Sequence, residues 1–155
     1  MSHLTILFCS SRDPISWAIR ELTWSDWSHV GILEPNGKYV VEARYSEVRR
    51  VPLAVFLADN DVVQPKQYRC DDLQSAIGFA WEQVGKPYDV KALFGFIEHR
   101  DIASPDKWFC SELGIATLNA GGPVRVDLDA VSRYTPQMLW MLAGDVLPRL
   151  KGQLS

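Results

Sequence analysis

Cys110 and His29 are the residues whose types could support nucleophilic catalysis. Cys110, in the run WFCSEL, opens a predicted helix, and His29 lies far upstream in the run SHVGIL. The positive end of a helix together with a nearby imidazolium can lower a cysteine pKa from about 8.5 to roughly 3.5–7.5. A thiolate formed in this way can attack a carbonyl carbon. The two residues are therefore the candidate nucleophile and base.

Glu42 is the candidate for the group that orients the histidine. Two strand-like segments flank a Pro-Asn-Gly sequence, which is the strongest hairpin signal in the chain. A two-residue turn at Asn36 and Gly37 would pair Gly31 with Glu42 and place His29 on the same face as both. Glu42 would then lie diagonally across from His29, where a carboxylate can fix the orientation and tautomer of an imidazole.

Each of these residues also has an ordinary structural role open to it. A free cysteine is more often a small buried residue than a nucleophile, and a strand histidine can simply be half-buried. That role suits Cys9, inside an apolar run, and Cys70, which precedes two aspartates whose charge opposes thiolate formation. Gly31 leaves room beside His29 for another element or for a substrate to approach the backbone.

The rest of the chain alternates short apolar strands with helices. Strands are expected at 4–10 and 61–69, the second being an edge strand or bulged because it contains Pro65. Asp71 is the expected N-cap of the second predicted helix, and Gly85 is its expected C-terminal stop. The helices are expected at residues 13–22, 73–84, 110–119 and 136–142.

Six tryptophans are many for a chain of 155 residues. Three of them, Trp24, Trp27 and Trp108, lie close in sequence to the candidate histidine or cysteine. They could line a substrate groove or build the core, and the sequence favours neither role. The helical spacing of Trp81 predicts a core position.

Composition bounds the function classes. We expect one domain spanning residues 1–155, with 47% hydrophobic residues to form its core. A net charge of −3, without long runs of either sign, argues against nucleic acid as the main partner. Neither a signal peptide nor an apolar run long enough for an integral membrane segment is evident, which predicts a cytoplasmic protein. Nothing in the pattern specifies an oligomeric state.

Three widely spaced cysteines suit neither a disulfide framework nor a paired zinc site. The expected chemistry needs no cofactor and no metal. A reduced cytoplasm fits this cysteine usage, whether the protein is bacterial or is encoded by a phage and acts inside its host.

Four short motifs occur along the chain in the order SHVGIL, VVEA, KPYD and WFCSEL. In that order they resemble the circularly permuted papain-fold cysteine peptidases, in the YiiX-like branch of the NlpC-type superfamily. Lecithin retinol acyltransferase is more distantly similar. The resemblance spans about Leu4 to Leu118. It implies an α+β fold, in which an antiparallel sheet of about five strands packs against helices that include the nucleophile helix.

The resemblance also implies residue roles. His29 would be the general base, Glu42 the residue that orients it, and Cys110 the nucleophile. Tyr88, in the KPYD motif, would line the site and could donate its hydroxyl to an oxyanion.

The expected function is cysteine-dependent hydrolysis of an amide in a peptide or a peptidoglycan fragment. Acyl transfer or lipid-ester hydrolysis in the same fold is an alternative, and it would use an acyl substrate. A third alternative is a binding or structural module that keeps the fold without catalysis.

Overall fold

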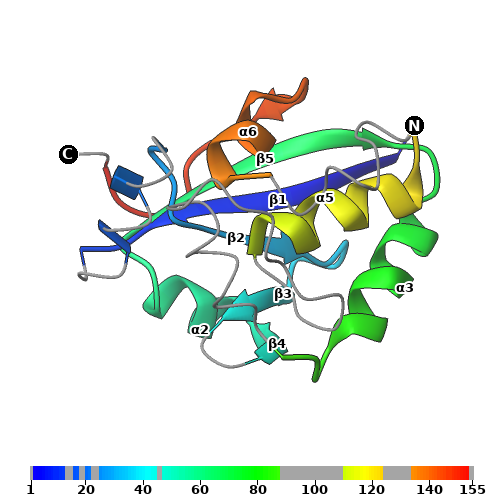
Figure 1. Cartoon of the computed structure of the whole chain (residues 1–155), viewed down its shortest axis with the longest axis horizontal. Coiled ribbons are helices and arrows are strands. Elements are labelled where there is room, and N and C mark those ends of the chain that lie inside the picture. The colour runs from blue at the N-terminus through cyan, green and yellow to red at the C-terminus, as the bar shows by residue number, and fades with distance from the viewer. Residues whose placement is uncertain are drawn as a thin grey trace.

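A six-stranded antiparallel sheet organises the chain, with the strand order β4-β3-β2-β1-β5-β6 (Figure 1). The computed structural model describes residues 2–12, 16–17, 20–21, 25–44, 47–87, 110–123 and 134–153. The strands are β1 (Ser2–Ser10), β2 (His29–Leu33), β3 (Tyr39–Arg44), β4 (Glu47–Pro52), β5 (Val62–Cys70) and β6 (Asp145–Val146). The helices within those ranges are α2 (Leu53–Ala58), α3 (Leu73–Gln83), α5 (Cys110–Gly121) and α6 (Pro136–Met141). The predicted α+β class is confirmed.

β1 lies at the centre of the sheet and is buried on both faces. Leu4, Ile6 and Phe8 belong to the core that α3, α5 and α6 cover, whereas Leu7 and Cys9 belong to the core that α2 covers. A strand with two buried faces needs apolar residues at nearly every position. The apolar run at the start of the sequence reflects that demand.

The hairpin between β2 and β3 has the predicted register but a different turn. Leu33 pairs with Val40, which is the alignment centred on Asn36 and Gly37. The Gly37 N–H donates to the Glu34 carbonyl over 2.8 Å, and Gly37 has a φ of 71°. The connection is therefore longer than two residues, with a β-turn from Glu34 to Gly37. The register is unchanged because the longer loop is symmetric about the same point.

β5 is neither an edge strand nor bulged, contrary to the prediction from Pro65. It pairs with β1 along all nine of its residues, and β6 pairs with its other side at Lys66 and Gln67. A proline lacks only one N–H, and at this position the carbonyl still accepts a hydrogen bond, from the Leu147 N–H.

Two details of α3 also differ from the expectation. Its N-cap is Asp72, one residue later than predicted, and the Asp72 side chain accepts from the Ser75 N–H over 2.9 Å. Trp81 is 50% exposed instead of buried, and its indole N–H donates to Glu34. Because indole carries a polar N–H, helical spacing alone does not make a tryptophan a core residue.

The predicted helices at 110–119 and 136–142 are confirmed as α5 and α6. Thr135 caps α6, accepting a hydrogen bond from the Met138 N–H, and Pro136 occupies the first turn. The predicted helix at 13–22 lies largely outside the described residues. β4 and α2 were not predicted, and both contribute to the site described next.

Gly114 lets α5 pack closely against α6, while its distance to β2 is that of an ordinary contact. A Cβ at Gly114 would lie 2.8 Å from Leu139 Cδ2 and 3.5 Å from Val30 Cγ2. At the start of the same helix, Cys110 reaches the backbone of β2 at Val30.

Candidate active site

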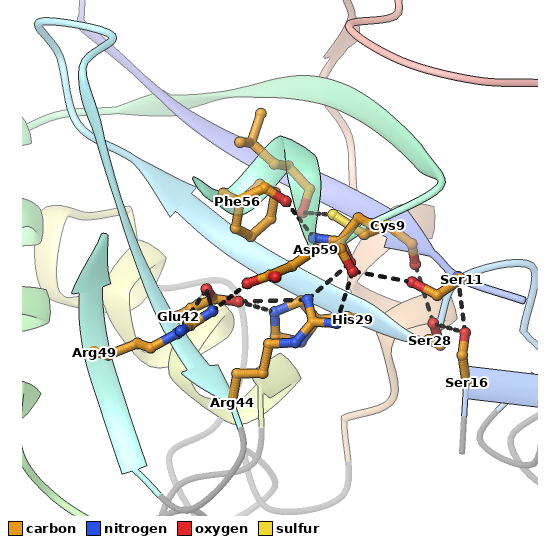
Figure 2. Close-up of polar contacts among 12 residues, drawn as sticks. Cys9, Ser11, Ser16, Ser28, His29, Glu42, Arg44, Arg49, Phe56 and Asp59 are labelled. Carbon is orange, nitrogen blue, oxygen red and sulfur yellow. Dashed lines mark hydrogen bonds and ion pairs between the residues drawn. The ribbon is translucent and has the colours of Figure 1, made fainter. Parts of the chain in front are cut away.

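His29 and Glu42 form a short, buried hydrogen bond. His29 Nε2 lies 2.6 Å from Glu42 Oε1, and the two residues are 9% and 0% exposed (Figure 2). The β2–β3 register explains the contact, since it places the two side chains diagonally on one face of the sheet. The structure thus brings together two of the predicted site residues.

α2 covers this face of the sheet and packs against the histidine. The Phe56 ring centroid lies 6.0 Å from that of His29. Gly31 makes the packing possible, because a Cβ there would lie 2.6 Å from Phe56 Cε2 and 2.6 Å from Val40 Cγ1. Gly31 was expected to let either another element or a substrate approach the backbone. In the structure the approaching group is an element, α2.

Two arginines surround the Glu42 carboxylate. Arg49 reaches Oε2 through Nε at 3.1 Å and Nη2 at 2.9 Å, and Arg44 Nη1 lies 3.8 Å from Oε1. Burial by itself raises the pKa of Glu42, but the hydrogen bond and charge of His29 and the charges of Arg49 and Arg44 outweigh it. The net effect lowers the pKa, so the carboxylate is ionised at neutral pH.

An ionised Glu42 sets the tautomer of His29. A carboxylate can only accept, so the nitrogen that faces it, Nε2, carries the proton. The other nitrogen, Nδ1, is then the one with a lone pair. This is the arrangement that a general base requires.

Cys110 is the first residue of α5 and is 1% exposed. Burial raises the pKa of its thiol to about 12, although the backbone N–H groups of Val30 and Ser111 donate hydrogen bonds to the sulfur and act in the opposite direction. The predicted lowering of this pKa is therefore wrong for the structure described. Loss of solvation outweighs the charge at the start of a helix when the sulfur is this deeply buried.

The side chains of Cys110 and His29 lie on opposite faces of the sheet at β2. His29 pairs with Cys9, which belongs to the core under α2, whereas Cys110 packs in the core under α5. The sulfur meets β2 at Val30, the residue next to His29. Among the contacts of the described residues, none joins the sulfur to a nitrogen of His29.

The remaining predicted residues divide into three groups. Cys9 and Cys70 are fully buried, in keeping with a structural role, and burial raises the pKa of the Cys9 thiol well above its usual range. Trp27 packs in the core with Phe8 and Trp140, at ring distances of 6.0 and 5.2 Å. Tyr88, Trp24 and Trp108 lie outside the described residues.

Arg49 and Asp59 are residues of this site that the sequence analysis did not identify. Arg49 Nη2 lies 2.7 Å from Asp59 Oδ2 (Figure 2). The available signal was the alternation of apolar and charged residues in EVRRVP. If this segment forms a strand after a short turn, Arg49 lies directly opposite Glu42, as observed. Because β4 was not predicted, that pairing could not be inferred.

Within the described ranges, no three His, Cys, Asp or Glu side chains are grouped so that they could hold a metal ion. No helix in those ranges is long and apolar enough to cross a membrane.

Comparison with known proteins agrees with this fold. The structure is similar to that of the metalloprotein YiiX from Escherichia coli O157:H7, with a TM-score of 0.57 and 27% sequence identity. The match covers 77% of this chain and 66% of YiiX, so the chain spans just under two thirds of that relative. No match was found among curated proteins. The sequence model of the permuted papain-like amidase family, YaeF/YiiX, C92, matches residues 5–135. The chain belongs to this family, which confirms the resemblance drawn from its four motifs.

Proposed function

We propose that the protein is a cysteine amidase in which Cys110 is the nucleophile, His29 the general base and Glu42 the residue that orients it. The observation that carries the proposal is the 2.6 Å hydrogen bond between His29 Nε2 and the buried, ionised Glu42. A carboxylate–imidazole pair of this kind is suited to removing the proton of a thiol.

The reaction begins with proton transfer from the Cys110 sulfur to His29 Nδ1. The thiolate attacks the amide carbonyl, a carbon–sulfur bond forms, and the carbon–nitrogen bond breaks as His29 returns the proton to the departing amine. Water, deprotonated by His29, then attacks the thioester carbonyl, the carbon–sulfur bond breaks to release the acid, and the Cys110 thiolate takes the proton back from His29. The backbone N–H groups of Val30 and Ser111, which donate to the resting sulfur, stabilise the thiolate.

The resting thiol sets an energetic condition on this mechanism. Relative to an ordinary thiol, a pKa of about 12 opposes thiolate formation by about 4 kcal/mol. Formation of a thiolate–imidazolium pair between Cys110 and His29 would have to offset that cost. The two side chains lie on opposite faces of the sheet, so the productive state requires the His29 imidazole and the Cys110 sulfur to approach each other at the start of β2, where His29 is the first residue.

The substrate class follows from the family, whose members are described as amidases. We propose an amide in a peptide or a peptidoglycan fragment. YiiX is described as a metalloprotein, and the described residues of this chain hold no group of three His, Cys, Asp or Glu side chains that could bind a metal ion.

Alkylation by iodoacetamide tests the proposed nucleophile without a known substrate. Peptide-resolved mass spectrometry at pH 6–8 should find Cys110 alkylated faster than Cys9 and Cys70, and His29→Ala should abolish the difference. Cys9→Ser is the matched control, because Cys9 lies directly opposite His29 on β1 and is the alternative thiol partner. Equal, slow alkylation of all three cysteines would refute the proposal.

Hydrolysis of peptide amides and muropeptides then tests the reaction itself. Loss of the nucleophile in Cys110→Ala should lower kcat/KM by at least about 10³-fold. If amides are inert but an acyl group from an ester substrate accumulates on Cys110, the enzyme is an acyltransferase or esterase, and the amidase proposal is wrong.

A further inference from the structure

The two oxygens of the Glu42 carboxylate have different partners. Oε1 accepts from His29 Nε2 at 2.6 Å, and Oε2 accepts from Arg49 Nε at 3.1 Å and lies 2.9 Å from Arg49 Nη2 as an ion pair. A guanidinium that both hydrogen-bonds and ion-pairs with one oxygen restrains the rotation of the carboxylate. The position of Arg49 therefore determines where Oε1 points.

Arg49 is itself held in place from the other side. Its Nη2 contacts Asp59 Oδ2 at 2.7 Å, and Asp59 is the C-cap residue of α2. The Asp59 carbonyl accepts from Arg44 Nη2 at 3.0 Å. As Figure 2 shows, His29 from β2, Arg44 from β3 and Arg49 from β4 surround the Glu42 carboxylate, and Asp59 at the end of α2 binds Arg49.

We infer that Arg49, braced by Asp59, is a positioning residue that keeps Glu42 ionised and aimed at His29 Nε2. The inference rests on the proposed role of His29 as the base. The charged and titratable groups that face Glu42 are His29 from β2, Arg44 from β3, Arg49 from β4 and Cys9 from β1.

The chemical reason is that a carboxylate and a carboxylic acid impose opposite tautomers on a histidine. Without Arg49, burial of Glu42 is opposed by fewer charges, so the pKa of its carboxyl rises. A protonated Glu42 donates to Nε2 instead of accepting from it. The imidazole proton then sits on Nδ1, which no longer has the lone pair needed to accept the thiol proton.

Arg50 provides a matched control on the same strand. It points to the opposite face of the sheet, where its Nε and Nη2 hold the carboxylate of Glu34, which is 2% exposed. Arg49 and Arg50 thus each pair with a buried carboxylate, Arg50 through both oxygens of Glu34 and Arg49 through one oxygen of Glu42, but only the Glu42 pair includes His29. Replacing either arginine by glutamine removes an ion pair from a buried carboxylate.

The experiment compares Arg49→Gln, Arg49→Lys, Asp59→Asn and Arg50→Gln with the wild type. The first readout is the rate of iodoacetamide alkylation at Cys110 between pH 5 and 9. The second is the His29 tautomer, from ¹⁵N chemical shifts of the imidazole. Thermal unfolding measures how much of any change is loss of stability.

Arg49→Gln should lower the alkylation rate at pH 6 by about tenfold, equivalent to about 1.4 kcal/mol. The acid limb of its pH profile should move to higher pH, and the Nδ1–H tautomer should appear. Arg49→Lys should be intermediate, because an ammonium keeps the charge but cannot engage both carboxylates with a fixed fork. Asp59→Asn should shift the profile less, in the same direction. Arg50→Gln should lower the unfolding temperature and leave profile and tautomer unchanged.

A profile and tautomer in Arg49→Gln that match those of Arg50→Gln would overturn the inference. If Arg49→Gln does not fold, unchanged values in Arg49→Lys and Asp59→Asn would overturn it equally. Failure of the proposed function is distinguishable, because then the wild-type Cys110 would show no His29-dependent alkylation, while the tautomer measurement would still report on Arg49.

Discussion

Glu42→Gln is the substitution whose effect the structure defines most closely. The side chains have the same shape, so the change removes a charge and leaves the packing in place. The wild-type carboxylate accepts from His29 Nε2 and from Arg49 Nε, and it forms an ion pair with Arg49 Nη2. Removing one partner of a buried ion pair costs about 3–5 kcal/mol. Arg49 keeps Asp59 and is 23% exposed, so we expect a loss at the low end, about 3 kcal/mol of unfolding free energy at pH 7.

The pH dependence gives the prediction a sign. Because the folded protein lowers the pKa of Glu42, the charge stabilises the fold above the unfolded-state pKa of about 4.3. That contribution is lost as the pH falls through the lower, folded-state pKa. The difference in unfolding free energy between wild type and Glu42→Gln should therefore be largest near neutral pH and should narrow progressively below about pH 4.

Urea unfolding at several pH values from 7 to 3 measures this difference. Glu34→Gln is the matched control: hydrogen bonds from Arg50 and Trp81 lower the pKa of Glu34. The difference in unfolding free energy between wild type and Glu34→Gln should narrow in the same way as the pH falls. Only Glu42→Gln, however, should slow alkylation of Cys110. A difference for Glu42→Gln that stays constant from pH 7 to 3, or that is absent at pH 7, would refute the electrostatic account.

Four further predictions concern packing and the thiol. Gly31→Ala should destabilise the fold by about 1–3 kcal/mol in urea unfolding, because the new methyl would lie 2.6 Å from two side chains packed over it. Gly114→Ala should change stability by less than about 1 kcal/mol, since its shortest contact, 2.8 Å, is with the end of one leucine side chain and alanine favours a helix; a loss equal to that of Gly31→Ala would contradict this. Lys66→Met should cost about 2 kcal/mol and loosen α6 in hydrogen exchange, because Nζ donates to two backbone carbonyls at the end of that helix, at 2.5 and 2.7 Å; unchanged exchange there would count against it. In His29→Ala, alkylation of Cys110 should keep rising beyond pH 10 without a plateau, since burial raises the pKa of this thiol to about 12; a plateau near pH 8 would mean that the thiol is not buried in solution.

Local patterns in the sequence predicted those elements whose signals lie close together along the chain. The Pro-Asn-Gly turn set the β2–β3 register, because the strands on either side can pair in only one way that keeps both apolar faces buried. That register alone brought Glu42 to His29. Thr135 and Pro136 likewise marked the start of α6, since capping and a fixed proline φ act within one turn.

The patterns failed where a short element depends on its neighbours. α2 has six residues, too few to be stable alone, and it forms because Phe56 fills the space above Gly31. β4 carries adjacent arginines on opposite faces of the sheet. Each is accommodated because it pairs with a glutamate on its own face, Arg49 with Glu42 and Arg50 with Glu34. Trp81 was expected in the core, and a hydrogen bond to Glu34 holds it at the surface.

The sequence by itself determined the order of the motifs, the helix that begins at Cys110 and the pairing of Glu42 with His29, because each depends on local spacing. Only the tertiary structure decided the electrostatics of the site. It buries the Cys110 sulfur against Val30, which raises the pKa of the thiol instead of lowering it, and it joins Arg49 and Asp59 to Glu42. Burial and charge pairing depend on which distant segments meet, and spacing along a chain does not encode those encounters.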